Sequence, residues 1–388
     1  MAEVSFTFRK MGTTHYARAL IIGVGALALW LVTGATGAVQ TIDPSPTDLA
    51  RAPIFRSCVN LGNALDAPKE GEWGFRIEPW QLDAIARAGF DAVRIPVRFS
   101  AHASLTPPFA LDPQFLARVD ELIGYARARH LKVIVDMHHY DAASDQPQTE
   151  LARFRALWRQ LSAHWKDQPD DLVLEILNEP HGAADPAWVK RFNDAALAQI
   201  RAHNPTRKVI LATPFWGSFR GLQALASMDG LPRDPNVIAS LHYYEPYDFT
   251  HQGVKWVDHP PPLGRIWGSD ADRENLRRDF AQFADFGREH QTPIFLGEFG
   301  VNADVAPAQR ALYLGAVRRA AEGAHMPHCV WAFAAGFDIW DFDRLTWAPG
   351  IQQALIGEPR SAPQSDHRAN TKPRSAAPSS ATLRPRFK

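Results

Sequence analysis

Residues 172–181 read Leu-Val-Leu-Glu-Ile-Leu-Asn-Glu-Pro-His, a short and mostly apolar run that ends in polar residues. A run of this length, closed by a proline, is typical of a strand buried on both faces of a sheet. Seven similar runs occur along the chain, separated by amphipathic helical patterns such as residues 114–129 and 151–165. Strands that alternate with helices in this way indicate parallel strands joined by crossover helices.

The eight predicted strands recur at similar intervals. They cover residues 58–63, 92–97, 133–138, 172–178, 209–213, 237–242, 294–298 and 329–333. Their starts are on average about 39 residues apart, which suits the repeating strand and helix of a closed α/β barrel. We therefore expect a single (β/α)8 TIM barrel rather than an open, doubly wound sheet.

The amino-terminal segment differs in composition from the rest. Residues 19–32 form an uncharged apolar run that follows Arg18 and precedes small residues up to Ala38, which is the layout of an export signal. We expect residues 1–38 to be a signal peptide cleaved after Ala38, or an uncleaved anchor in which residues 19–39 cross the inner membrane. Both alternatives place the folded part outside the cytoplasm, in the periplasm or the extracellular space.

We expect the folded body to be one domain, residues 39–356. Residues 357–388 consist mainly of Pro, Ser, Ala and Arg, so they predict a disordered basic tail. The chain has 42 Lys and Arg and 42 Asp and Glu, and the basic residues are in excess at both ends, so the body is mildly acidic. This charge argues against nucleic-acid binding, and we expect a monomer.

The two cysteines lie on the first and last predicted strands, which are neighbours in a closed barrel. A disulfide between Cys58 and Cys329 is geometrically possible in an exported protein, and two buried free thiols are an alternative of equal weight. Neither cysteine belongs to a Cys-x-x-Cys pair or to a zinc-finger spacing. The sequence therefore predicts no metal centre of this type.

Polar and aromatic residues gather where the predicted strands end. In barrels of this kind, catalytic groups lie at the carboxyl ends of the strands, and a purely structural barrel does not need such residues there. They are Asn60, Asn63, Arg94, Arg98, Asp136, His138, His139, Tyr140, Asn178, Glu179, Trp216, His242, Tyr244, Glu298 and Trp331.

Two of these residues are glutamates that close apolar strands. Glu179 follows the fourth strand and Glu298 ends the seventh, and these strands face each other across the mouth of a barrel. A salt bridge or a helix cap would explain either glutamate alone equally well. Together they can flank one glycosidic bond, and a separation of about 5–5.5 Å would suit cleavage with retention of configuration.

The motif at residues 172–181 resembles the signature of glycoside hydrolase family 5, the cellulase and mannanase family. The resemblance covers essentially the whole body and extends to Val59–Asn63, Val93–Val97, Asp136–Tyr140, Leu241–Pro246, Gly297–Gly300 and Trp331–Phe333. It implies that Glu179 is the acid/base and Glu298 the nucleophile, with Arg94 and Tyr244 donating hydrogen bonds to Glu298. It also implies that Asn178 binds the sugar 2-hydroxyl and that His138 and His242 complete a polar floor.

Further residues are expected to bind the substrate. Aromatic faces pack well on the apolar faces of sugar rings, and Trp331 resembles the family's platform beneath the reactive sugar. We also expect Asn63, His139, Trp73 and Trp216 to line subsites. A metal ion shared by His138 and His139 is disfavoured because neighbours on a strand point to opposite faces, although packing of His139 behind the strand end is an alternative.

Together these features predict an exported, retaining β-glycosidase that acts on a polysaccharide or oligosaccharide without a cofactor or a metal. An endo-β-1,4-glucanase is the first choice. A β-mannanase, an exo-β-1,3-glucanase and a hydrolase that trims polysaccharide during its synthesis use the same chemistry and stay open. A glycan-binding protein without hydrolysis is the alternative from another class, and the presence of both carboxylates argues against it.

Overall fold

The computed structural model describes residues 55–357. The predicted export signal or anchor and the basic tail after Gly357 lie outside the described residues. Within residues 55–357, every helix is too short or too polar to cross a lipid bilayer.

The eight predicted strands are present and form one closed parallel barrel in sequence order, which β1 closes by pairing with β8. The (β/α)8 prediction is therefore confirmed. The strands are β1 (Ser57–Asn60), β2 (Ala92–Val97), β3 (Lys132–Met137), β4 (Leu172–Glu175), β5 (Val209–Leu211), β6 (Val237–His242), β7 (Ile294–Phe299) and β8 (His328–Val330).

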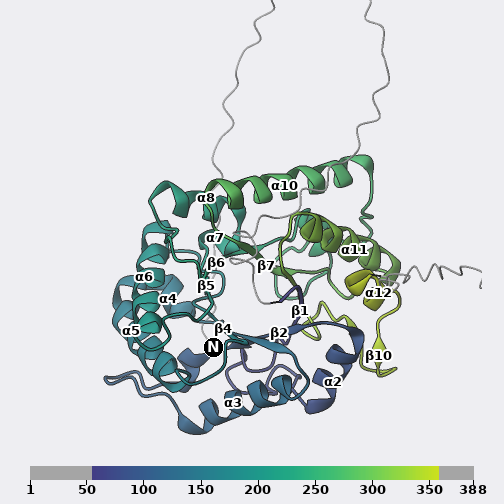
Figure 1. Ribbon diagram of the computed structural model, residues 1–388. Helices are drawn as coiled ribbons and strands as arrows, with labels where there is room; N and C mark the ends of the chain where they lie inside the picture. Colours follow the sequence, from purple (N-terminus) through teal and green to yellow (C-terminus); the bar gives the residue numbers. More distant parts are fainter. Residues whose placement is uncertain (1–54, 358–388) are drawn as a thin grey trace, which may run out of the picture. The chain divides into compact units, whose positions relative to one another are not determined.

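Helices lie outside the strands (Figure 1). The longer ones are α2 (Pro79–Ala88), α3 (Pro113–Arg127), α5 (Pro147–His164), α6 (Pro186–His203), α8 (Phe219–Ser227), α10 (Asp270–Glu289) and α11 (Pro307–Gly323). Five of them have proline in the first turn, where the missing N–H costs no helical hydrogen bond. The shorter elements are η1 (Phe99–His102), α4 (Asp141–Asp145), α7 (Pro214–Gly217), α9 (Tyr247–Thr250), α12 (Ile351–Ile356) and the hairpin strands β9 (Trp340–Asp341) and β10 (Thr346–Trp347).

Several strands end earlier than the apolar runs suggested. The predicted strand 172–178 ends at Glu175 in the structure, whereas 92–97 and 237–242 have the predicted bounds. The backbone of Glu179 has a φ of 42°, a left-handed conformation that no regular strand contains. On this strand the chain thus leaves the sheet before Asn178 and Glu179, whereas His242 and Glu298 still lie within β6 and β7.

The barrel interior is filled in layers. The lower layer is apolar and takes one residue from each strand: Cys58, Ala92, Ile134, Val173, Ile210, Ile238, Phe295 and Cys329. Side chains two residues further along a strand share its face, and on five strands these residues are polar: Asn60, Arg94, Asp136, Glu175 and Ser240. All five are buried, so the period of the strand places a polar layer with three charged residues directly above the apolar one.

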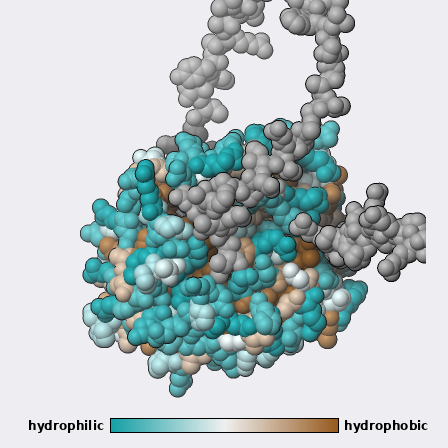
Figure 2. Space-filling view, in the orientation of Figure 1, coloured by the Kyte–Doolittle hydropathy of each residue, from teal (hydrophilic) through white to brown (hydrophobic). Residues whose placement is uncertain are grey.

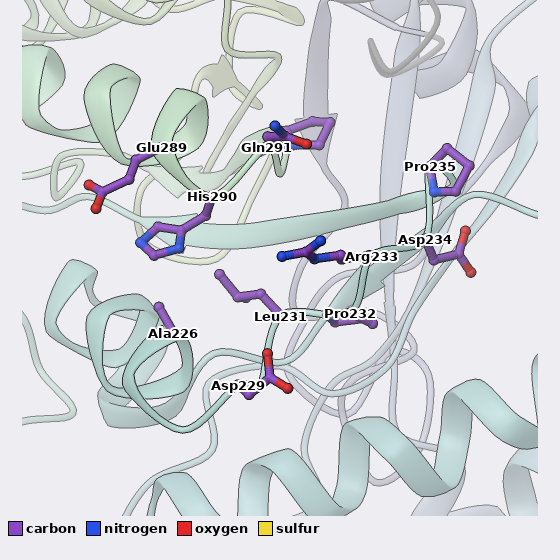
Figure 3. Close-up of a pocket in the computed structure, with 11 residues that line it drawn as sticks. Ala226, Asp229, Leu231, Pro232, Arg233, Asp234, Pro235, Glu289, His290 and Gln291 are labelled. Carbon is purple, nitrogen blue, oxygen red and sulfur yellow. The ribbon is translucent and has the colours of Figure 1, made fainter.

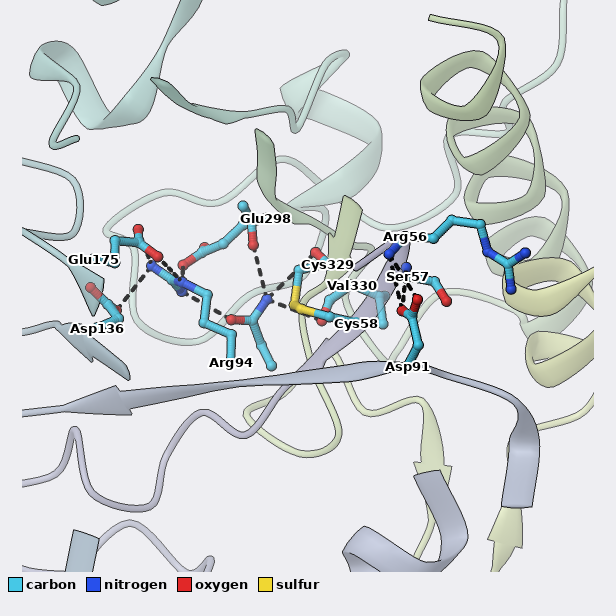
Figure 4. Close-up of a disulfide and its surroundings, with 12 residues drawn as sticks. Arg56, Ser57, Cys58, Asp91, Arg94, Asp136, Glu175, Glu298, Cys329 and Val330 are labelled. Atoms are coloured by element: carbon cyan, nitrogen blue, oxygen red, sulfur yellow. Dashed lines mark hydrogen bonds and ion pairs between the residues drawn. A yellow bond between two sulfur atoms is a disulfide. The ribbon is translucent and has the colours of Figure 1, made fainter. Parts of the chain in front are cut away.

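Cys58 and Cys329 form a disulfide between β1 and β8 (Figure 4). The two residues are directly paired in the parallel ladder, which brings their sulfur atoms together in the lower layer. The structure therefore selects the disulfide over the two free thiols that the sequence left open. The crosslink spans 271 residues of sequence and fastens the two strands that close the barrel.

Replacing both cysteines with alanine is expected to lower the free energy of unfolding by about 2–5 kcal/mol, because the crosslink restricts a long loop of the unfolded chain. Denaturant unfolding of the wild type and the double variant measures the difference. As a control, a reductant should lower the midpoint of the wild type and leave that of the variant unchanged. Equal midpoints for the two oxidised proteins would contradict a stabilising role.

Candidate active site

A cleft of about 1150 Å³ opens at the carboxyl ends of the strands. Every residue predicted to act in catalysis or to bind the substrate lines it except Arg94, which lies beneath it. These lining residues are Asn63, Trp73, His138, His139, Asn178, Glu179, Trp216, His242, Tyr244, Glu298 and Trp331. The strand-end residues Asn60, Arg98, Asp136 and Tyr140 do not line it either. The sequence therefore predicted the members of one continuous surface.

Arg94 is the centre of a buried ionic network beneath the cleft (Figure 4). Its side chain is fully buried, and it donates to Glu175 through Nε (2.7 Å) and Nη2 (2.8 Å). Nη1 donates to Asn60 and to Glu298, both at 2.9 Å. Nη2 also lies 2.9 Å from both Asp136 and Asn178. A rigid guanidinium with this many partners fixes the positions of the side chains around it.

Glu175 is a site residue that the sequence reasoning missed, since the run 172–178 was treated as an apolar strand. It is 1% exposed and makes a two-point contact with Arg94. The available signal was a charged residue inside an otherwise apolar strand, which is rarely buried unless it is paired.

Glu175→Gln is expected to lower kcat about 10- to 100-fold, since one of its two contacts with Arg94 is lost and small displacements of reacting groups are costly. KM should change much less, because Glu175 does not line the cleft. Steady-state kinetics on a soluble glycan, with the unfolding midpoint measured beside it, tests this role. A changed KM with an unchanged kcat would contradict it.

Glu298, at the end of β7, is nearly buried and has two fixed donors. Arg94 Nη1 lies 2.9 Å from Oε1, and the Tyr244 hydroxyl donates to Oε2 at 3.0 Å. Burial raises the pKa of Glu298 to about 7, while His242, Arg94 and the Tyr244 hydroxyl act to lower it. Both donors favour the ionised carboxylate over the acid.

Glu179 faces Glu298 across the cleft. One carboxylate oxygen of each residue and a ring nitrogen of His242 lie within 4.8 Å of one another. His242 Nδ1 is 2.7 Å from Glu179 Oε1 and 3.7 Å from Glu298 Oε2. Burial raises the pKa of Glu179 to about 7. Burial of the His242 ring lowers the pKa of His242, which favours the neutral imidazole.

The polar floor connects Arg94 with the histidines. Asn178 accepts from Arg94 at 2.9 Å through Oδ1, and its amide nitrogen lies 3.3 Å from His138 Nε2. On its other side, His138 Nδ1 contacts the buried carboxylate of Asp136 at 2.5 Å. These contacts fix the orientation of both the amide and the imidazole.

Aromatic rings form the walls of the cleft. The Trp331 ring lies parallel to the His138 ring at 5.5 Å, and a β-carbon on Gly62 would approach the indole within 2.6 Å. A glycine is therefore needed at position 62 for the Trp331 ring to lie where it does. Trp73 and Trp216 are 40% and 57% exposed, which leaves ring surface free for a ligand.

A ring nitrogen of His138 and one of His139 lie within 4.8 Å of each other, closer than the sequence argument assumed. Strand alternation was expected to turn them apart, but β3 ends at Met137, before either histidine, and both line the cleft. Asp66, which the sequence reasoning missed, lies beside them. It is fully buried, and its carboxylate accepts hydrogen bonds from the backbone N–H groups of Asn63 and Ala64.

A second, smaller cavity lies away from the predicted residues. This cavity, of about 280 Å³, lies before the starts of β6 and β7, at the opposite ends of the strands, and includes Arg233, Asp234 and His290 (Figure 3). None of the predicted residues lies there. The face shown in Figure 2 is mostly hydrophilic with scattered hydrophobic residues, as is usual for a protein surface.

Two glutamates this close, facing each other in a cleft that exposes indole rings, suit the cleavage of a glycosidic bond. The fold and the site thus define a barrel glycoside hydrolase. Comparison with known families gives the particular one: the chain belongs to the cellulase family, glycosyl hydrolase family 5, whose model matches residues 67–336.

Individual relatives agree with this assignment. Endoglucanase H of Acetivibrio thermocellus is 32% identical over 274 residues, which are 71% of this chain but only 28% of that protein. Among solved structures, Thermotoga maritima Cel5A in complex with mannotriose has a TM-score of 0.76 and 37% identity, covering 79% of this chain and 99% of that one. Cellulose synthase subunit Z from Clostridioides difficile has a TM-score of 0.74 and 32% identity, covering 78% and 99%.

Proposed function

We propose that the protein is a retaining endo-β-1,4-glucanase. The observation that carries the proposal is the pair Glu179 and Glu298, in which one carboxylate oxygen of each residue lies within 4.8 Å of the other. An inverting enzyme holds its two carboxyl groups about 6.5–9.5 Å apart to admit a water molecule, whereas a retaining enzyme holds them closer. The similarity to Endoglucanase H supports the choice of substrate.

The proposed roles follow from the donors around each carboxylate. Glu298, with Arg94 and Tyr244 donating to it, remains ionised and attacks the anomeric carbon, forming a glycosyl ester. Glu179 has no cationic donor among the described contacts and carries the proton that assists the leaving group. After esterification it acts as the base toward water. Asn178, held by Arg94, hydrogen-bonds the sugar 2-hydroxyl.

Trp331 forms the platform for the reactive sugar, and Trp73, Trp216, Asn63 and His139 contact neighbouring units. Each of these side chains lines the cleft. The indoles of Trp73 and Trp216 each pack against a histidine ring: Trp73 contacts His139 edge-on, and Trp216 stacks on His181 with ring centroids 3.4 Å apart. Rings that are already supported by packing provide binding surface with little loss of side-chain freedom.

The test is reducing-sugar release from carboxymethylcellulose, mannan, laminarin and xyloglucan by the purified full chain. Activity on carboxymethylcellulose, with a rapid fall in viscosity, is the expected result for endo action. Glu179→Gln and Glu298→Gln should each remove it. Folded protein that is inactive on all four glycans would overturn the proposal and favour glycan binding without hydrolysis.

A β-mannanase is the second candidate, since a neighbour at 37% identity was solved with mannotriose. A preference for mannan over carboxymethylcellulose in the same assay would establish it. A role in trimming newly made polysaccharide is a further alternative, for which the similarity to a cellulose synthase subunit is the support. The chemistry at the cleft is the same in each case.

We also propose that residues 1–38 direct export, as a cleaved signal or as an anchor through residues 19–39, and that residues 39–356 are the catalytic domain. The apolar run after Arg18 supports the proposal. Fractionation of cells that produce the full chain, with sequencing of the mature amino terminus, separates the two alternatives. Retention of unprocessed protein in the cytoplasm would contradict both.

A further inference from the structure

A second group of ligand-type side chains lies in the cleft beside the catalytic pair. Asp66, His138 and His139 each present an oxygen or a ring nitrogen, and these three atoms lie within 4.8 Å of one another. All three residues line the cleft. Two imidazoles and one carboxylate are a common set of protein ligands for zinc and copper ions.

His138 is already oriented in the way metal-binding histidines are. Its Nδ1 contacts the buried Asp136 carboxylate at 2.5 Å, which places the proton on that nitrogen and leaves the Nε2 lone pair free to accept. A carboxylate behind a histidine is the usual outer partner of a metal-binding imidazole. The competing donor at Nε2 is the Asn178 amide at 3.3 Å, which is long for a hydrogen bond.

Asp66 is held in place and retains the capacity to bind. Each carboxylate oxygen accepts one backbone N–H, from Asn63 at 2.9 Å and from Ala64 at 2.7 Å. An ionised carboxylate has about four acceptor positions, so a lone pair remains on each oxygen. His139 is only partly buried, and its ring is therefore the member of the group that can adjust.

The group of Glu179, His242 and Glu298 has similar spacing, but its charge is unfavourable for a cation. The Arg94 guanidinium donates directly to Glu298 at 2.9 Å, so a metal ion there would lie close to a buried positive charge. In the group of Asp66, His138 and His139, no described arginine or lysine makes a hydrogen bond to any of the three side chains. Arg94 and Arg98 act on the two imidazoles only at longer range, and the Asp136 carboxylate lies between Arg94 and His138.

We propose that Asp66, His138 and His139 bind one divalent transition-metal ion of the zinc or copper type. In a tetrahedral site with bonds of about 2.0–2.1 Å, the ligand atoms are about 3.4 Å apart. The three atoms lie within 4.8 Å of one another, so the group must contract by up to about 1.4 Å, which a movement of the His139 ring would supply. All three residues line the cleft, so water from the cleft would supply the fourth ligand.

The ion would exclude the glycan, because His138 belongs to the polar floor and His139 to a proposed subsite. It is therefore an inhibitor and not a cofactor. This consequence rests on the proposed function, whereas binding of the ion does not. We expect the apparent KM to rise in proportion to the zinc concentration above its dissociation constant, without a plateau, and kcat to stay unchanged.

Calorimetric titration of the full chain with zinc chloride, repeated with cobalt chloride and the visible absorption of the cobalt complex, measures binding without any substrate. One ion per chain is expected. Asp66→Asn and His139→Ala should each weaken binding at least about tenfold, a typical effect of disturbing a metal site. His251→Asn, which changes another histidine of the same cleft, should bind as the wild type does.

Glu179→Gln separates the two groups, since it removes a ligand only from the catalytic one. Undiminished zinc binding by this variant supports the proposed site, and loss of binding overturns it. The proposal also fails if the wild type shows no saturable binding, or if Asp66→Asn and His139→Ala, with unchanged unfolding midpoints, bind as tightly as the wild type. An enzyme that binds zinc but hydrolyses no tested glycan would refute the proposed function and leave the metal site standing.

Discussion

Glu298→Gln is expected to lower kcat/KM on the natural glycan by roughly 10⁴-fold or more, which is the scale of losses when a nucleophile is removed. Glutamine keeps the volume of the side chain and a carbonyl that Arg94 or Tyr244 can still donate to, but an amide cannot form the glycosyl ester. The loss should appear in kcat, because the rest of the cleft is unchanged. Initial rates on carboxymethylcellulose measure it.

The matched control is Glu274→Gln. Glu274 lies on the exposed surface of α10 and pairs with Arg277, so this change should alter the rate less than twofold. Labelling supplies an independent test, since an activated 2-fluoro glycoside should leave a covalent sugar on Glu298 and on no other glutamate. Labelling of Glu179 instead would reverse the assigned roles.

The sequence predicted the fold because one strong pattern repeats eight times. Each apolar run with its following helix indicates a parallel unit, and the number of units favours closure. The polar ends of the runs then indicated the site, because all parallel strands of a barrel end on the same side. Glu179, Glu298 and Arg94 were therefore proposed as neighbours without knowledge of distances, and the structure places the two glutamates in one cleft with Arg94 beneath them.

Contacts across the barrel were harder to predict. Glu175 was overlooked because the residue that neutralises its charge, Arg94, lies 81 positions earlier in the sequence. Only the layering of the barrel interior brings the two side chains together. Asp66 lies in a loop without periodic pattern, so nothing in the sequence linked it to His139. His138 and His139 both line the cleft, as expected, but the argument that strand alternation keeps their ring nitrogens apart was wrong, because β3 ends at Met137, one residue earlier than predicted.

The disulfide is another contact that the sequence alone could not establish. Positions on the first and last strands made a bond between Cys58 and Cys329 geometrically possible. The register of β1 against β8, which pairs the two residues directly, is a property of the closed barrel and not of either strand alone. A shift of one residue would point the two side chains to opposite faces.

Glu179→Gln should show a different pattern from Glu298→Gln, because the general acid matters only for a poor leaving group. Hydrolysis of the natural glycan is expected to fall about 10²- to 10⁴-fold. An aryl glycoside with an acidic phenol should still form the glycosyl ester at a rate close to that of the wild type. Its hydrolysis should then be slow, and added azide, which needs no base, should restore turnover and give a glycosyl azide.

The pH profile provides the second part of this test. Burial raises the pKa of both carboxyl groups to about 7, and two negative charges within 4.8 Å repel each other. The first proton therefore leaves Glu298, which has Arg94 and Tyr244 as donors, and the second stays on Glu179. Activity of the wild type should fall as the pH rises through about 7, when Glu179 loses its proton, and should also fall at low pH, when Glu298 gains one.

The alkaline fall in kcat/KM should be absent from Glu179→Gln acting on the activated aryl glycoside, because glutamine does not titrate, and the acidic fall should remain. If the alkaline fall persists in this variant, another group must carry the proton, and His242, which contacts both carboxylates, would be the residue to test. If azide gives no rescue while the ester still forms, Glu179 is not the base of the second step. The two measurements together distinguish an acid/base from a residue that only positions the substrate.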